Sequence, residues 1–105
     1  MASINDVARY ILEVCGHISV EKLQTMCYHA QKWHNHWTDK PLLEELCEKK
    51  DNTIIYPTLL KEFKGKEIVG KYDIKGNSAR LNANEKSSIE VVCIMENGSI
   101  INLNS

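Results

Sequence analysis

A chain of 105 residues has room for one domain with a modest core. Its 43% hydrophobic and 26% charged residues are those of an ordinary globular protein, and no apolar run approaches the roughly 20 residues of a membrane span. A formal net charge of −1 provides no global field to attract nucleic acid and is too small for the acidic surface of a DNA mimic.

Two helices are predicted in the first part of the chain. Ser3 and Asp6 have the spacing of a capping box, which predicts the start of a helix. Gly16 predicts where this first helix ends. Ser19 predicts the start of a second helix, in which apolar side chains recur at helical spacing. The inward stripe of this helix is Leu23, Met26, Cys27, Ala30, Trp33, His34 and Trp37. Residues 22–37 are therefore the predicted central helix of the domain.

Two shorter helices are predicted to follow. Asp39 and Pro41 favour the start of a third helix. Its apolar stripe would be Leu42, Leu43, Leu46 and Cys47. A fourth helix is expected after Pro57 and would end at Gly65.

The second half of the chain has the composition of strands. The segments "EIVGKYDI" and "SIEVVCIM" are rich in β-branched and aromatic residues. Asn97 and Gly98 follow as a two-residue hairpin signal, because both residues accept a positive φ. We therefore predict an α+β fold in a single domain, residues 1–105. Its helical N-terminal half, 1–65, would pack on a small C-terminal antiparallel β-meander, 66–105.

The order of residues in the first half resembles that of a known family. "DVARYILEVCGHISVEKLQTMCYHAQKWH", followed by "KPLLEE", resembles the opening of the Panacea domain, the SocA-like antitoxin family of bacteria and their phages. "IYPTLLKEFKG" resembles the Tyr-containing segment that precedes the fourth helix of that family. The matching positions of the opening are Asp6, Val7, Ala8, Tyr10, Ile11, Ile18, Lys22, Leu23, Gln24, Tyr28, Ala30, Gln31, Trp33, Pro41 and Leu42.

Two features depart from the family pattern. This chain has "CEKKDNTI" where the family carries an acidic-Ala-Trp stretch and a Gly-Pro-Val turn. Residues 66–105 carry strand patterns where the family continues with helices. The resemblance thus covers about residues 5–65. It implies a small regulator, encoded on phage or other mobile DNA, that neutralises a toxin by binding it and in some members delivers it to a protease.

The function expected from this resemblance is binding and inhibition of a protein partner, without enzymatic activity. The partner would be a toxin or, for an altered and shortened member, a host defence protein such as a CRISPR effector nuclease. Trp37 is the candidate anchor for that partner, because it lies near the end of the predicted helix, where side chains are less completely covered, and exposed aromatic side chains are frequent anchors at interfaces. Lys32 and His36 are the other candidate partner-binding residues. Homodimerisation stays open, because "SIEVVCIM" would expose apolar residues on both faces of a strand.

Cys27, His34 and Cys47 are candidate zinc ligands. Tetrahedral zinc needs four nitrogen or sulfur ligands that converge, and the chain has no local Cys or His spacing typical of such sites. A third helix folding back from Asp39 would bring Cys47 beside Cys27. The alternative, which we expect, is that these cysteines and Cys15 are small core residues and that no cofactor is bound.

Other classes of function find less support in the residues. A winged-helix-like DNA-binding regulator is the alternative, with residues 20–36 as recognition helix, but that helix has no arginine for phosphate contacts. Cys15 and His17 lie close together without the signature of a cysteine hydrolase, so no enzyme is expected. The amphipathic N-terminus with Asp6 and Glu13 differs from a signal peptide, which predicts a cytoplasmic protein with reduced thiols and no membrane partner.

Overall fold

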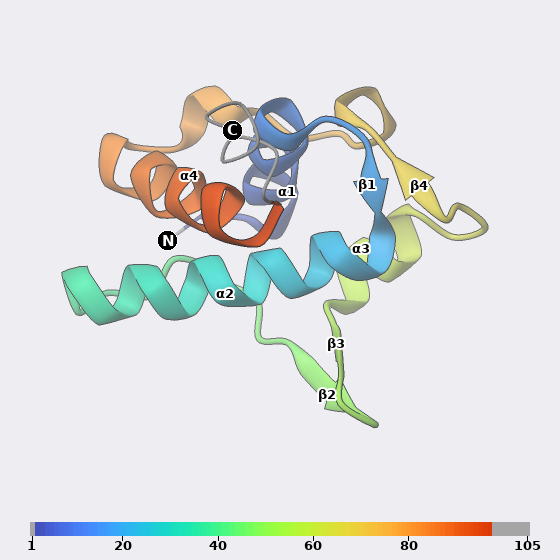
Figure 1. Cartoon of the computed structure of the whole chain (residues 1–105), viewed down its shortest axis with the longest axis horizontal. Helices are drawn as coiled ribbons and strands as arrows, with labels where there is room; N and C mark the ends of the chain where they lie inside the picture. The colour runs from blue at the N-terminus through green and yellow to red at the C-terminus, as the bar shows by residue number, and fades with distance from the viewer. Residues whose placement is uncertain (1, 98–105) are drawn as a thin grey trace.

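A computed structural model describes residues 2–97, and the protein has an α+β fold, as predicted (Figure 1). In chain order the elements are α1 (Ile4–Cys15), β1 (Ile18–Ser19), α2 (Val20–Thr38), β2 (Glu48–Lys50), β3 (Thr53–Ile55), α3 (Pro57–Glu62), β4 (Ile68–Val69), the 3₁₀ turns η1 (Lys71–Asp73) and η2 (Ser78–Arg80), and α4 (Ala83–Asn97). The strands form two separate antiparallel pairs, β1 with β4 and β2 with β3.

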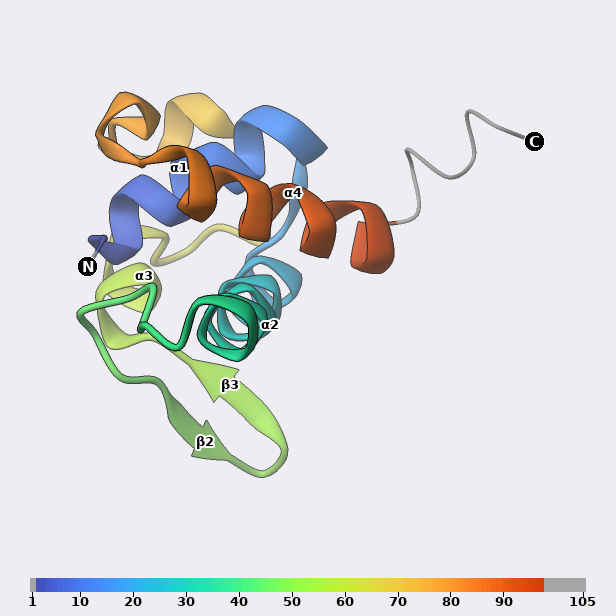
Figure 2. The ribbon, with the colours of Figure 1, turned by 90° about the vertical axis from the view of Figure 1, so that its left-hand side faces the viewer.

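Helix α2 is central in the fold. Helices α1 and α4 lie on one side of it, and the β2–β3 hairpin projects from the opposite side (Figures 1 and 2). The side chains between these layers form one apolar cluster, because each helix turns its apolar stripe inward. The largest fully buried members are Ile11, Leu12, Leu23, Met26, Leu42, Tyr56, Leu59, Phe63 and Ile89.

The starts of α1 and α2 follow from capping side chains, as predicted. The Ser3 hydroxyl accepts a hydrogen bond from the backbone N–H of Asp6 at 3.2 Å. The Ser19 hydroxyl accepts one from Lys22 at 3.0 Å. Each bond satisfies a donor that has no partner within its helix. Helix α2 ends at Thr38, and its C-cap residue, Asp39, adopts a left-handed conformation with φ 59°.

The predicted third helix is wrong: residues 39–47 are not helical. The side-chain oxygen of Gln31 on α2 accepts hydrogen bonds from the backbone N–H groups of Leu42 and Leu43, at 2.7 Å each. These bonds hold the segment against α2, and Ala2 forms a parallel bridge with Leu43. The next residues form the β2–β3 hairpin, whose turn residues Asp51 and Asn52 both have positive φ, as such turns require.

The predicted C-terminal β-meander is also wrong within residues 2–97. "SIEVVCIM" belongs to helix α4, whose start is fixed by a reciprocal capping box between Asn82 and Glu85, with both bonds 2.8 Å long. Ile89, Val92 and Cys93 are buried at helical spacing, so apolar residues assigned to two strand faces form one helical stripe. The reason for expecting a second copy on a strand face therefore no longer applies.

Of the two other strand predictions, one falls largely outside the described residues and the other is confirmed only in part. Asn97 is the last residue of α4, and the rest of the predicted hairpin, residues 98–105, lies outside the described residues. Of "EIVGKYDI", only Ile68–Val69 is a strand, paired with β1. The segment after it packs on α1, where Arg9 Nη1 donates to the carbonyl of Lys71 at 2.9 Å. Among residues 2–97, no helix is both long and apolar enough to cross a bilayer.

Candidate partner-binding site

A groove of about 560 Å³ lies between the second half of α2 and the last turns of α4. The two helices run antiparallel, so residues that are far apart in the sequence meet along it (Figure 1). We call it the α2–α4 groove. Its lining residues are His29, Lys32, Trp33, Asn35, His36, Val92, Met95 and Glu96.

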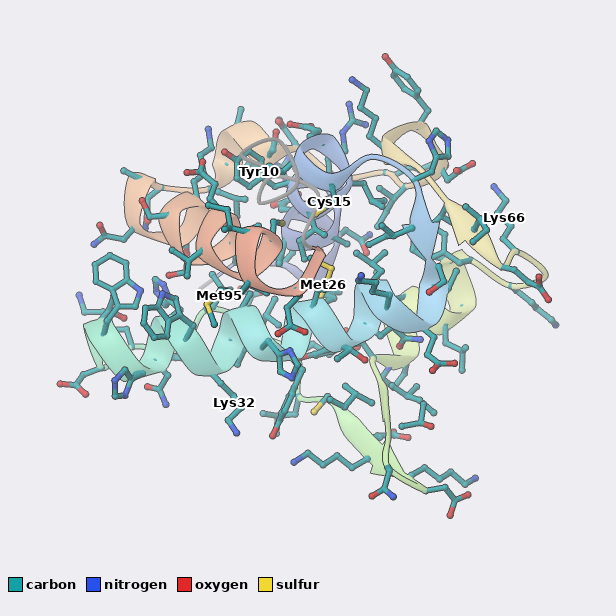
Figure 3. The ribbon with its side chains drawn as sticks, in the orientation of Figure 1. Tyr10, Cys15, Met26, Lys32, Lys66 and Met95 are labelled. Atoms are coloured by element: carbon teal, nitrogen blue, oxygen red, sulfur yellow. The ribbon has the colours of Figure 1, made fainter. Side chains whose placement is uncertain are left out.

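The apolar part of the α2–α4 groove remains open to solvent. The side chain of Met95 is 65% exposed and that of Trp33 is 38% exposed, whereas Val92 beneath them is buried. Figure 3 shows Met95 extending from α4 toward α2. The Trp33 ring lies 5.8 Å from that of His36, centroid to centroid, in a tilted arrangement. Exposed large apolar groups in a concave site are typical of an interface.

Charged groups border this apolar surface. His29 Nδ1 on α2 lies 3.0 Å from Glu96 Oε1 on α4, so the pair spans one end of the groove. The ammonium group of Lys32 extends away from α4 (Figure 3) and lies 5.4 Å from the centroid of the Tyr28 ring. Lys49 of the hairpin lies 4.6 Å from the same centroid, and its hydrogen bond lowers the pKa of the Tyr28 hydroxyl.

Trp37 lies beyond the end of the α2–α4 groove. Its indole N–H donates to the Ser88 hydroxyl at 2.7 Å, and His34 Nδ1 lies 2.8 Å from the same oxygen. Ser88 donates its own proton to the carbonyl of Asn84 at 3.0 Å, so His34 Nδ1 carries a hydrogen and acts as a donor. These bonds join the end of α2 to α4. Burial lowers the pKa of His34, which favours its neutral form.

The predicted partner-binding residues are therefore divided between two places. Lys32 and His36 line the α2–α4 groove together. Trp37 lines a separate polar hollow with His34 and, although 45% exposed, uses its N–H group inside the molecule. The sequence reasoning missed Met95, because it placed that residue in a strand. The Asn82–Glu85 capping box is the signal that would have placed it on a helix.

The three candidate zinc ligands do not form a group that could hold a metal ion. Cys27 is fully buried, and burial raises the pKa of its thiol, which opposes the thiolate that zinc requires. Cys47 is half-buried beside the Tyr56 hydroxyl, whose pKa is raised by burial and also by Cys27 and Cys47. His34 is hydrogen-bonded to Ser88. Within residues 2–97, no three His, Cys, Asp or Glu side chains are grouped closely enough to hold a metal ion.

The remaining two thiols, those of Cys15 and Cys93, contact each other. Cys15, at the end of α1, and Cys93 on α4 share a hydrogen bond, which lowers the pKa of Cys15. The same bond and burial raise the pKa of Cys93. His17 does not contact Cys15 through this bond; its ring packs against Gly70, where an added Cβ would lie 2.6 Å from His17 Nε2. The partner of Cys15 in the fold is thus a second cysteine.

Compared with known proteins, the chain matches no family model, no curated protein and no solved structure. The relation to the Panacea domain therefore stays a prediction from the quoted residues. Several of those residues have clear structural roles here. Leu23 and Ala30 are fully buried on α2. Gln24 and Gln31 accept backbone hydrogen bonds, the former from Tyr56 at 2.6 Å, and so fix the segments that pack against α2.

Proposed function

We propose that the chain is a non-enzymatic cytoplasmic protein that binds and inhibits a protein partner through the α2–α4 groove. The partner would be a toxin or a host defence protein such as a CRISPR effector nuclease, and the gene would belong to a phage or another mobile element. The resemblance of residues 5–65 to the Panacea domain supports the choice of an antitoxin-like inhibitor.

The observation that carries the proposal is the exposed apolar surface of Trp33 and Met95 inside a bordered groove. Covering these side chains with a partner would remove apolar area from water, which is the main favourable term in protein association. The surrounding His29–Glu96 pair, Lys32 and His36 would provide the polar rim that selects the partner.

The test begins with a tagged full-length chain used as bait in a lysate of the cells that naturally contain it. Met95→Glu places a charge in the apolar part of the α2–α4 groove and should abolish capture, since Met95 is exposed and its replacement leaves the core intact. Leu46→Glu is the matched control, because Leu46 is 85% exposed and lies outside the groove.

Capture is followed by an activity assay on the purified partner. The proposal predicts that wild-type chain and Leu46→Glu suppress a toxin or nuclease activity of the captured protein, whereas Met95→Glu does not. Equal inhibition by Met95→Glu would mean that the interface lies outside the α2–α4 groove. If only DNA-associated proteins are captured and nuclease treatment removes them, the DNA-binding regulator replaces the inhibitor. Light scattering on the same protein determines whether it forms a dimer.

A further inference from the structure

A second groove, of about 630 Å³, lies on the other side of the molecule from α4, between the β2–β3 hairpin, α3 and the start of α2. Its floor is apolar and consists of Val20, Ile55, Pro57, Leu60 and Phe63. Leu60 is 51% exposed, although its neighbour Leu59 is fully buried in the core. The exposed side chain of Leu60 therefore offers apolar surface, at the floor of a concave site, that a ligand could cover.

The border of this groove is strongly basic. Four lysines line it, namely Lys50, Lys61, Lys64 and Lys66, against the single carboxylate of Glu48. We therefore call it the lysine groove. Lys66 Nζ lies 3.0 Å from Asp73 Oδ1. Among the described residues, the other three lysines have no carboxylate within 4.0 Å. A chain with a net charge of −1 thus concentrates positive charge around one apolar hollow.

The combination of charge and apolar floor favours a protein segment over nucleic acid. Single-stranded nucleic acids are bound by stacking their bases on exposed aromatic faces, but the one aromatic ring of this groove, Phe63, is buried. No arginine lines the groove, so it offers no planar group for bidentate phosphate contacts. An aliphatic side chain would instead fill the space above Leu60 while carboxylates on either side approach the lysines.

We propose that the lysine groove binds an acidic protein segment that carries an apolar anchor side chain. Leu60 and Ile55 would contact the anchor, and Lys50, Lys61 and Lys64 would pair with Asp or Glu side chains of the segment. This inference does not depend on the α2–α4 groove or on its partner, because the two grooves share no lining residue.

The test measures binding of fluorescein-labelled peptides to the full-length chain by fluorescence anisotropy. The probe is a peptide of about 12 residues with Leu side chains spaced among Asp and Glu. One comparison peptide has every Leu replaced by Ser at the same charge. A second keeps Leu and replaces the acidic residues by Lys. A labelled oligothymidine of similar charge is the nucleic-acid comparison.

Two variants separate charge from apolar contact at the groove. Lys61→Glu with Lys64→Glu reverses two exposed charges, and Leu60→Ser removes the exposed floor contact. Lys40→Glu with Lys75→Glu is the matched control, since both lysines are exposed and lie outside the lysine groove. All replaced side chains are exposed, so the fold should survive, and circular dichroism of each variant checks this.

We expect the acidic Leu-containing peptide to bind about tenfold more weakly to Lys61→Glu/Lys64→Glu, with a clear loss also in Leu60→Ser and none in the lysine control. Binding should weaken as salt rises, and the amide signal of Gly65 should shift in NMR spectra of the complex. No binding of the probe, equal binding of the Ser-substituted peptide, equal loss in the lysine control, or preferred binding of oligothymidine would each overturn the proposal. Because Met95→Glu leaves the lysine groove intact, failure of the proposed inhibitor function would not change these results.

Discussion

The two grooves differ in how the chain builds them. The α2–α4 groove joins residues 29–36 to residues 92–96 and exists only because α4 returns to α2 across the molecule. The lysine groove is formed almost entirely within residues 48–66, by a hairpin and the helix that follows it. The first surface should therefore depend on long-range packing and the second largely on local structure. Variants of α4 can separate the two.

The largest effect is expected from loss of core volume in α4. Ile89→Ala removes buried methyl groups between α4 and the other helices and should lower the free energy of unfolding by about 2–4 kcal/mol. Ile94→Ala on the same helix, at a partly exposed position, should cost less than about 1 kcal/mol. Chemical denaturation measures both. Similar losses for the two variants would mean that α4 does not pack as described.

Next in size is loss of the hydrogen bonds that join α2 to α4. Ser88→Ala leaves the Trp37 N–H and His34 without their shared acceptor, which should cost about 1–3 kcal/mol because these donors are buried or partly buried. Ser87→Ala, on the exposed side of α4, should change stability by less than about 0.5 kcal/mol. Thermal denaturation of the pair decides whether the Ser88 hydroxyl stabilises this contact.

A smaller, pH-dependent effect should follow from His34. Burial lowers its pKa in the folded state below the usual value of 6.5, so the unfolded chain binds a proton more readily. The contribution of neutral His34 to the free energy of unfolding should be fully present above pH 6.5. It should decline as the pH falls from 6.5 through the lower folded-state pKa of His34. His34→Asn should flatten this part of the curve, measured by denaturation at a series of pH values. An unchanged slope would assign the effect to other groups.

The smallest effects on stability, and the sharpest separation of the grooves, are expected from their exposed side chains. Met95→Ala and Leu60→Ala should each change the free energy of unfolding by less than about 1 kcal/mol, because both side chains are more than half exposed. Met95→Ala should weaken binding of the inhibited partner and leave the acidic peptide unaffected. Leu60→Ala should do the opposite, and a double mutant should show additive losses.

Much of the N-terminal half could be predicted, because its signals are local. Ser3 and Ser19 cap helices through hydrogen bonds to residues three positions away, and these bonds do not depend on the rest of the fold. The apolar stripe of α2 identified Leu23, Met26, Cys27 and Ala30 as core residues, all fully buried. The same stripe placed Trp33 inward, although it lines an open groove, since periodicity alone does not show how far a partner helix extends.

The errors lie where local patterns were ambiguous. Residues 88–95 contain enough β-branched side chains for a strand, yet their apolar positions also fit a helix, and packing against α1 and α2 decides for the helix. Residues 41–47 carry a helical stripe, but the Gln31 side chain takes the N–H groups of Leu42 and Leu43. Gln31 is separated from Leu42 by 11 positions and from Leu43 by 12, and it lies on a different segment. A local sequence pattern cannot reveal hydrogen bonds of this kind.

The sequence by itself therefore determined the α+β class, the starts of α1 and α2, and the core face of α2, because capping and periodicity act within a few residues. The tertiary structure alone decided that Lys32 and His36 share a groove with Met95 and that the Trp37 indole is bonded to Ser88. It also decided that Cys27, His34 and Cys47 do not form a three-ligand group among the described residues. Each of these outcomes depends on where α4 and the 39–47 segment settle against α2. That position is fixed by packing and hydrogen bonds between residues distant in the chain.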